Sequence, residues 1–339
     1  MNYSEVLENA KKTIGPNCHV CPVCNGIACG NTLPGPGSKG PGNGANDNYN
    51  AWKKIKVNMD TIVANTEIDT STDFFGKKLE LPLFSAPIGS IRLQYNPTDD
   101  VKDFNEKCIA ACENKGIVHF YSTGLELATQ EAAIASRIAH SNAGVPVINP
   151  EVDENIINQM NICNKEQSPL AITVVVDSAG LPHLRACHGS GGTKSIEQLR
   201  MLSEKAKVPF IVKGIMTPKS ALKAIEAGAD AIIVSNHGGR VLADSPATAE
   251  VLPEIADAVA GKVKIIVDGG IRSGLDMFKA YALGADYCMI CRPVLISYYG
   301  GGQEGMECYF DKLRTELVDT MYMCGARSIS DITRDMVRL

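Results

Sequence analysis

The sequence has no long apolar run, no excess of positive charge and no apolar leader. No run reaches the roughly 18 residues that a membrane-spanning helix needs, and the N-terminal stretch 1–15 lacks the apolar core of a signal peptide. The net charge of −5 argues against binding to nucleic acid or to an anionic membrane surface. We therefore expect a cytoplasmic protein that binds neither nucleic acid nor a membrane.

Cysteine, in contrast, is abundant. The chain has 12 cysteines, which would stay reduced in the cytosol, so metal binding or packing is expected in preference to a disulfide framework. Four of them near the N-terminus follow the spacing C-x2-C-x2-C-x4-C, and four thiolates on one short loop can ligate zinc or an iron–sulfur cluster. A redox-active or disulfide-forming pair and simple loop packing are the alternatives. The candidate ligands are Cys18, Cys21, Cys24 and Cys29.

Two zones can be distinguished along the chain. Residues 1–78 form a Cys- and Gly-rich segment that we expect to be irregular, and its Gly/Pro/Asn-rich stretch 33–50 is either a linker or an ordered loop. From residue 79 onward, short apolar runs alternate with segments of helical period. The runs are 81–86, 117–121, 145–148, 170–176, 210–213, 231–235, 264–268 and 287–290, and the expected helices lie near 101–115, 129–140, 152–163, 195–206, 218–227, 247–260, 273–283 and 303–323.

This alternation predicts the fold class. Strands that alternate with helices at this spacing form right-handed crossovers and a parallel sheet. About six units would leave an open sheet, whereas eight close into a barrel. We therefore predict an α/β protein, with a (β/α)8 TIM barrel over residues 79–339 and the segment 1–78 packed on it.

The loops after the last two predicted strands have the composition of a phosphate site. Barrel enzymes bind phosphate there, at the C-terminal ends of the strands. The loop 268–274 contains two adjacent glycines and Arg272, and the loop 291–293 contains Arg292 just before a helical start. Backbone can approach a ligand closely at glycine, and arginine can grip a phosphate with two donors. The alternative is that the glycines only make turns and that the arginines are solvated.

Other strand ends contain acid–base and cationic groups. Lys213 closes the fifth run, where it needs either an anionic cofactor atom or a salt-bridge partner. After the sixth run, His237 can take up a proton, and Arg240 can reach the same space and grip a carboxylate. Asp177 ends the fourth run and could orient the imidazole. A structural histidine and an aspartate that only caps a turn are the alternatives.

Three stretches resemble a known family, the FMN-dependent 2-hydroxy-acid oxidases and dehydrogenases, which include glycolate and lactate oxidases. They are VKGIMTPKSALKAIEAGADAIIVSNHGGR (212–240), VDGGIRSGLDMFKAYALGAD (267–286) and CRPVL (291–295). Weaker similarity extends over about residues 50–335. The resemblance implies FMN as cofactor, a small lactate- or glycolate-like 2-hydroxy acid as substrate, and a homo-oligomer.

The resemblance also implies roles for individual residues. His237 would be the base, with Asp177 as its partner, while hydride passes from the substrate to flavin N5. Arg240, together with His237, would bind the substrate and hold its carboxylate. The implied FMN contacts are Pro87, Ile88, Gly89, Ser122, Asn149, Lys213, Ser235, Asp268, Gly269, Gly270, Arg272, Cys291 and Arg292.

On the substrate side the chain departs from the family pattern. A Cys- and Gly-rich segment stands where the family has an N-terminal Tyr-Tyr motif, and the third strand ends in 147–151, Val-Ile-Asn-Pro-Glu, without a second tyrosine. Val175 replaces a threonine, and only Arg185 is available as a second substrate arginine. Two rival functions therefore stay open, a flavin isomerase and a non-catalytic flavin/iron–sulfur redox module. A cluster at the N-terminal cysteines would favour a dehydrogenase over an oxidase.

Overall fold

Eight parallel strands close into a barrel, as the sequence predicts. The computed structural model describes residues 1–124, 126–182, 184 and 191–339. The strands follow one another around the barrel in the order β10-β11-β4-β5-β6-β7-β8-β9. Their bounds are β4 Leu83–Ser85, β5 Val118–Ser122, β6 Gly144–Ile148, β7 Ile172–Val175, β8 Phe210–Ile215, β9 Ala231–Val234, β10 Lys264–Val267 and β11 Tyr287–Ile290.

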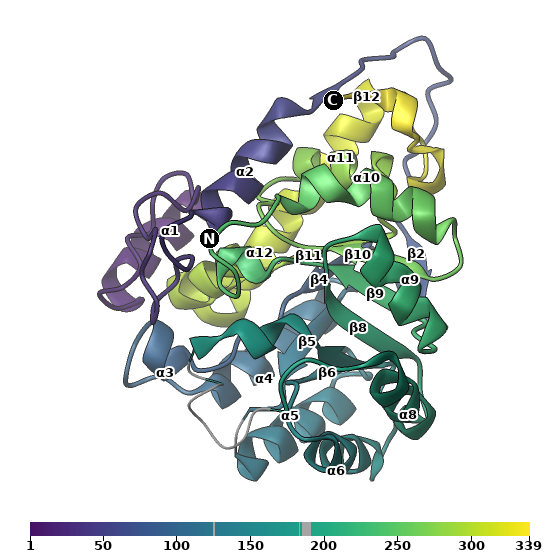
Figure 1. Cartoon of the computed structure of the whole chain (residues 1–339). Coiled ribbons are helices and arrows are strands. Elements are labelled where there is room, and N and C mark those ends of the chain that lie inside the picture. Colours follow the sequence, from purple (N-terminus) through teal and green to yellow (C-terminus); the bar gives the residue numbers. More distant parts are fainter. Residues whose placement is uncertain (125, 183, 185–190) are drawn as a thin grey trace.

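Helices surround the barrel (Figure 1). They confirm the predicted positions, with one difference: the last helix begins about eleven residues earlier than expected. The glycine run 300–302 reads as an interruption, but the helix only kinks there and then continues. The bounds are α4 Val101–Asn114, α5 Leu127–Ala139, α6 Asp153–Asn164, α8 Ile196–Ala206, α9 Pro218–Glu226, α10 Thr248–Val259, α11 Gly274–Ala282 and α12 Arg292–Met323. Among the described residues, none of the helices combines the length and apolarity needed to cross a bilayer.

The barrel strands are apolar on both faces, because one face packs in the barrel interior and the other packs against the surrounding helices. In β9, Ala231 and Ile233 pack in the barrel interior, while Ile232 and Val234 pack toward the surrounding helices, and all four are fully buried. Strands of parallel sheets covered by helices read as continuous apolar runs for this reason. The alternating apolar runs of the sequence are therefore sufficient to build the barrel.

The N-terminal segment is more regular than its composition suggests. The expectation of an irregular segment is wrong for α1 (Tyr3–Thr13) and α2 (Gly44–Lys54). Asn2 and Glu5 form a reciprocal cap that starts α1, and Asn43 caps α2. Helix α1 packs along α12, so the segment lies against the barrel (Figure 1).

Short strands complete the connection between the segment and the barrel. β1 (Lys56–Val57) pairs with β12 (Val337–Arg338), so the N-terminal segment also forms a two-stranded antiparallel sheet with the last residues of the chain. β2 (Thr72–Phe74) and β3 (Lys77–Leu79) form a hairpin that crosses the expected boundary between residues 78 and 79.

Phe74 anchors the hairpin in the barrel. Its ring lies 4.7 Å from Phe84, 6.2 Å from Phe120 and 5.3 Å from Tyr287, measured between centroids, and it is fully buried. Aromatic rings at such separations contribute beyond their buried area. Phe74 therefore joins the hairpin to the interior side chains of β4, β5 and β11.

We expect Phe74→Ala to lower the free energy of unfolding by about 3–5 kcal/mol, because it opens a cavity among these rings. Denaturant unfolding measures the change. Leu222→Ala on α9, where the side chain is 44% exposed, is the control and should stay within about 0.5 kcal/mol of the wild type. A Phe74 variant as stable as this control would contradict the anchoring role.

Candidate active site

A cavity of about 470 Å³ lies at the C-terminal ends of the strands. The active sites of (β/α)8-barrel enzymes lie at this end of the barrel. The predicted residues that line it are Pro87, Ile88, Gly89, Ser122, Asn149, Lys213, His237, Arg240, Asp268, Gly269, Gly270, Arg272, Cys291 and Arg292. Of the remaining predictions, Asp177 and Ser235 lie directly behind this wall, bonded to His237 and Lys213 respectively. Arg185 lies outside the described residues.

His237 and Asp177 form a hydrogen-bonded pair. His237 Nδ1 is 3.2 Å from each carboxylate oxygen of Asp177. This contact uses one ring nitrogen and leaves Nε2 to act toward the cavity, which the histidine lines. His237 has a φ of +57°, a left-handed conformation that is uncommon for a residue with a side chain. The pair has the geometry of a general base with an orienting carboxylate.

The carboxylate of Asp177 stays ionised. Burial by itself would raise the pKa of Asp177, but the charges of His237 and Lys213 outweigh burial and hold it below its ordinary value. The neighbouring Gly214 has a φ of +106°, and a Cβ there would lie 2.5 Å from the Asp177 Cβ. Only glycine therefore leaves room for the aspartate behind the imidazole.

A second buried network lies beneath the cavity. Lys213 Nζ donates to Ser235 Oγ at 2.7 Å, and the Ser235 hydroxyl donates to Asp268 Oδ2 at 2.9 Å. Burial would lower the pKa of Lys213, but Asp268 and Asp177 raise it above its ordinary value, so the ammonium stays charged. Asp268 Oδ1 is buried and has no partner among the described residues. Lys213 Nζ also lies 3.4 Å from Asp268 Oδ2, so the network places an ion-paired ammonium and an unused acceptor oxygen beneath the cavity.

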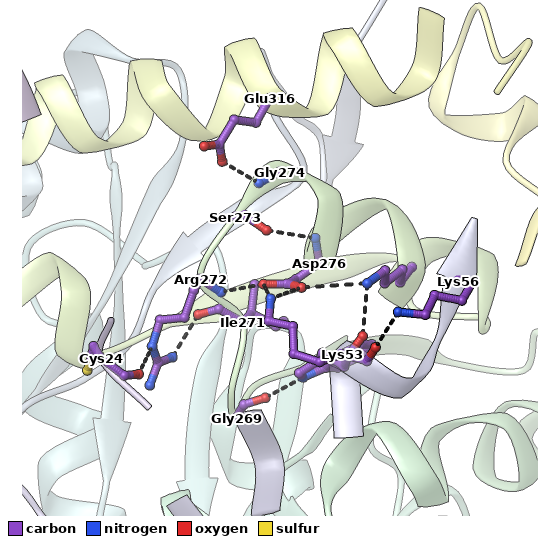
Figure 2. Close-up of polar contacts among 12 residues, drawn as sticks. Cys24, Lys53, Lys56, Gly269, Ile271, Arg272, Ser273, Gly274, Asp276 and Glu316 are labelled. Carbon is purple, nitrogen blue, oxygen red and sulfur yellow. Dashed lines mark hydrogen bonds and ion pairs between the residues drawn. The ribbon is translucent and has the colours of Figure 1, made fainter. Parts of the chain in front are cut away.

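The three arginines of the cavity lack carboxylate partners. In the part of the chain that the structure describes, none of Arg240, Arg272 and Arg292 forms a salt bridge. Arg272 donates from Nε to the Cys24 carbonyl and from Nη1 to its neighbour's carbonyl, both at 2.8 Å, as Figure 2 shows. Its Nη2 is buried without a partner among the residues described. Among the described residues, Arg292 has one carbonyl acceptor, Pro36 O, at 3.5 Å.

Helix α2 holds the glycine loop that precedes Arg272. Gly270 has a φ of +78°, and a Cβ there would lie 2.3 Å from the Asn48 carbonyl, so the loop can approach α2 only as glycine. Trp52 Nε1 donates to Gly269 O at 2.7 Å. Lys53 forms an ion pair with the buried Asp276 at 2.8 Å, next to the Arg272 backbone (Figure 2).

The same helix holds the histidine loop. The side-chain amides of Asn48 and Asn236 donate to each other at 2.7 and 3.1 Å, and both are buried. Asn236 Oδ1 also accepts the backbone N–H of Gly238 at 3.1 Å, which fixes the turn after His237. The N-terminal segment is thus part of the site's framework.

These residues fit the predicted FMN. Buried cations without an opposite charge are costly, and an anionic ligand removes that cost. Arg292 is the first residue of α12, so the phosphate side also has the positive end of a helix dipole. The turn 87–89 and Ser122 line the other part of the cavity, where the flavin ring would lie. The cavity therefore has a cationic end for phosphate and a wall for the ring.

The zinc or iron–sulfur prediction is not confirmed. Across the described ranges, no three His, Cys, Asp or Glu side chains are grouped to hold a metal ion, and all four N-terminal cysteines are free thiols. Burial raises the pKa of Cys18 to about 11, so its thiol stays protonated at neutral pH. The segment bonds through its backbone instead, with Cys24 O accepting from Arg272 and Cys29 O from Thr32.

Residues that the sequence did not suggest also line the cavity. Gln94 ends the short helix α3 (Ile91–Gln94), and Tyr95 follows it. They follow directly after the turn 87–89, which the resemblance assigns to the flavin, and that position in the sequence was the available signal. Pro36 lines the cavity from the N-terminal segment, and Asn48 supports it from behind. Nothing in the composition of the stretch 33–50 distinguishes those two from their neighbours.

Comparisons with known proteins agree with this geometry. The family model "FMN-dependent dehydrogenase" matches residues 36–186 and 188–339. A peroxisomal (S)-2-hydroxyacid oxidase of Arabidopsis thaliana is 35% identical over 323 residues, covering 86% of this chain and 87% of the relative. An L-lactate oxidase of Roseobacter sp. is 46% identical over 141 residues, covering 42% of this chain and 38% of the relative.

Solved structures show the same likeness. A point mutant of mandelate oxidase, solved with the monooxide FMN adduct, superimposes with a TM-score of 0.73 at 27% identity. The match covers 90% of this chain and 94% of that one. The family model spans nearly the whole barrel and all three loops with the cavity arginines. The chain therefore belongs to the FMN-dependent dehydrogenase family.

Proposed function

We propose that this chain oxidises a small 2-hydroxy acid, such as lactate or glycolate, to the 2-oxo acid with FMN as cofactor. The observation that carries the proposal is the His237–Asp177 pair, which faces a cavity that Arg240 also lines. A base and a carboxylate-binding cation in one cavity match the two functional groups of a 2-hydroxy acid. The relatives named as 2-hydroxyacid and L-lactate oxidases support the same substrate class.

Each residue has one task in this proposal. His237 Nε2 takes the hydroxyl proton of the substrate, while Asp177 holds the ring and stabilises the imidazolium that forms. Arg240 binds the carboxylate and so turns C2 toward the cofactor. Lys213 contributes the buried positive charge beneath the cavity. Bound FMN supplies, at N5, the acceptor for the hydride that leaves C2.

A cytoplasmic location and a homo-oligomeric state also belong to the proposal. The first is an expectation from the sequence alone, and the second rests on the family resemblance alone. Cell fractionation tests the location, and light scattering of the purified protein tests the assembly.

Anaerobic mixing with a panel of 2-hydroxy acids should remove the visible absorbance of the oxidised flavin. We expect His237→Ala to slow this reduction by about 10²–10⁴-fold, because the substrate proton loses its acceptor. His140→Ala is the control, since His140 is also bonded to a carboxylate, Glu113 at 2.7 Å, but lies outside the cavity lining. Wild-type protein that no acid reduces would point to a non-catalytic flavin module. A His237 variant reduced at the wild-type rate would also contradict the proposal.

Asp177→Asn should lower the rate of flavin reduction by about 10²–10⁴-fold, because the imidazolium loses the negative charge that stabilises it. Stopped-flow reduction with the best acid of the panel measures the change. Asp153→Asn removes a carboxylate that pairs with Lys194 at 2.8 Å away from the cavity, and it should keep the wild-type rate. Equal rates for the two variants would mean that Asp177 acts only in folding.

Arg292→Leu should weaken FMN binding by at least about tenfold, because it removes a charge-assisted contact to phosphate. The recovery of free-flavin fluorescence on dilution measures the dissociation constant. Arg200→Leu replaces an arginine whose side chain is 44% exposed and pairs with Glu226, and it serves as the control. Unchanged FMN affinity in Arg292→Leu would place the phosphate elsewhere.

A further inference from the structure

The guanidinium of Arg240 is held by three uncharged acceptors. Its Nη1 donates to Gly35 O at 2.7 Å and to Gly37 O at 2.8 Å, and its Nη2 donates to Gln94 Oε1 at 2.9 Å. Two of these acceptors are backbone carbonyls of the N-terminal segment, and the third is the side chain that ends α3. Arg240 is thus oriented by parts of the chain that are far apart in sequence.

These contacts leave one side of the guanidinium available. Arginine has five N–H donors, and here both on Nη1 and one on Nη2 are used. Nε and the second Nη2 hydrogen have no acceptor within the described residues. Two donors are what a carboxylate needs for a two-point contact. The three acceptors therefore select which side of Arg240 can meet a substrate.

Gln94 is the only side chain among the three acceptors that the described residues supply. It is 5% exposed, and its Oε1 also accepts the N–H of Gly35 at 2.7 Å. One oxygen thus binds both the arginine and the loop that delivers the two carbonyls. The oxygen is neutral, so the positive charge of Arg240 is not cancelled. A glutamate at this position would form an ion pair with Arg240.

The loop reaches Arg240 because it is built from glycine. A Cβ on Gly37 would lie 1.6 Å from Cys29 O, and one on Gly35 would lie 2.7 Å from Thr32 O. The Cys- and Gly-rich segment, which stands where the family has its Tyr-Tyr motif, thereby brings backbone carbonyls to the arginine. This chain orients its arginine with carbonyls and one amide.

We propose that Gln94 is a positioning residue, which fixes the side of Arg240 that faces the substrate carboxylate and keeps its charge available. The proposal rests on the proposed function, because that function makes Arg240 the carboxylate ligand. It adds a determinant of substrate affinity that acts through Arg240.

The test measures carboxylate binding separately from turnover. Pyruvate, a 2-oxo acid, is titrated into the oxidised flavoprotein, and the change in visible flavin absorbance gives its dissociation constant. The KM for lactate and the limiting rate of flavin reduction are measured alongside. The variants are Gln94→Leu, which removes the acceptor, and Gln94→Glu, which keeps its shape and adds a charge. Gln130→Leu is the control, because Gln130 is equally buried at 4% exposure and contacts Gln159 and Cys163 instead.

We expect Gln94→Leu to raise the dissociation constant of pyruvate and the KM for lactate by about tenfold, with the limiting rate within about threefold of the wild type. Gln94→Glu should weaken pyruvate binding further, since its carboxylate competes with the ligand for Arg240. Gln130→Leu should bind pyruvate as the wild type does. If Gln94→Leu does not fold, Gln94→Glu, which can keep both hydrogen bonds, decides the question.

Wild-type pyruvate affinity in both Gln94 variants would overturn the proposal, as would an equal loss in Gln130→Leu. A wild type that binds pyruvate but is not reduced by any 2-hydroxy acid would refute the proposed function. The role of Gln94 would then be decided by pyruvate binding alone. A wild type that does not bind pyruvate would overturn both.

Discussion

Positive charge without a protein counter-charge is the constraint on which this site depends. Arg240, Arg272 and Arg292 line one cavity, and no described carboxylate pairs with any of them. Backbone carbonyls solvate part of each guanidinium, which lowers the cost of burial without cancelling the charge. The uncancelled charge is then available to two anions, the cofactor phosphate and the substrate carboxylate. A salt bridge at any of the three would weaken that attraction.

The N-terminal segment supplies the carbonyls, and so it belongs to the active site. Cys24, Gly35, Pro36 and Gly37 accept from the three arginines. Helix α2 follows directly and supports the histidine loop and the glycine loop through buried hydrogen bonds. The cofactor end and the base therefore share one support. A disturbance of α2 should reach both, which ties the geometry of proton transfer to that of phosphate binding.

The substrate side and the cofactor side are held differently. The cofactor side combines strand ends, a helix N-terminus and a lysine network, all within the barrel that this chain shares with its family. On the substrate side, Val175 lines the cavity where the family has threonine, and Arg240 is oriented by carbonyls and by Gln94. The proposed reaction depends on the first set, while substrate choice depends on the second.

The sequence by itself determined the barrel and the ends of its strands. Apolar runs buried on both faces alternate with helices, and local pattern is enough to place each element. His237, Arg240 and Arg272 could be found because they follow such runs directly.

The tertiary structure alone decided what holds them: Gly35 O lies 205 residues from Arg240 in sequence, and Asn48 lies 188 from Asn236. A backbone carbonyl has no side chain to mark it, and a cysteine spacing does not reveal the path of its loop. For that reason the metal prediction is not confirmed, whereas the strand-end residues were placed as expected.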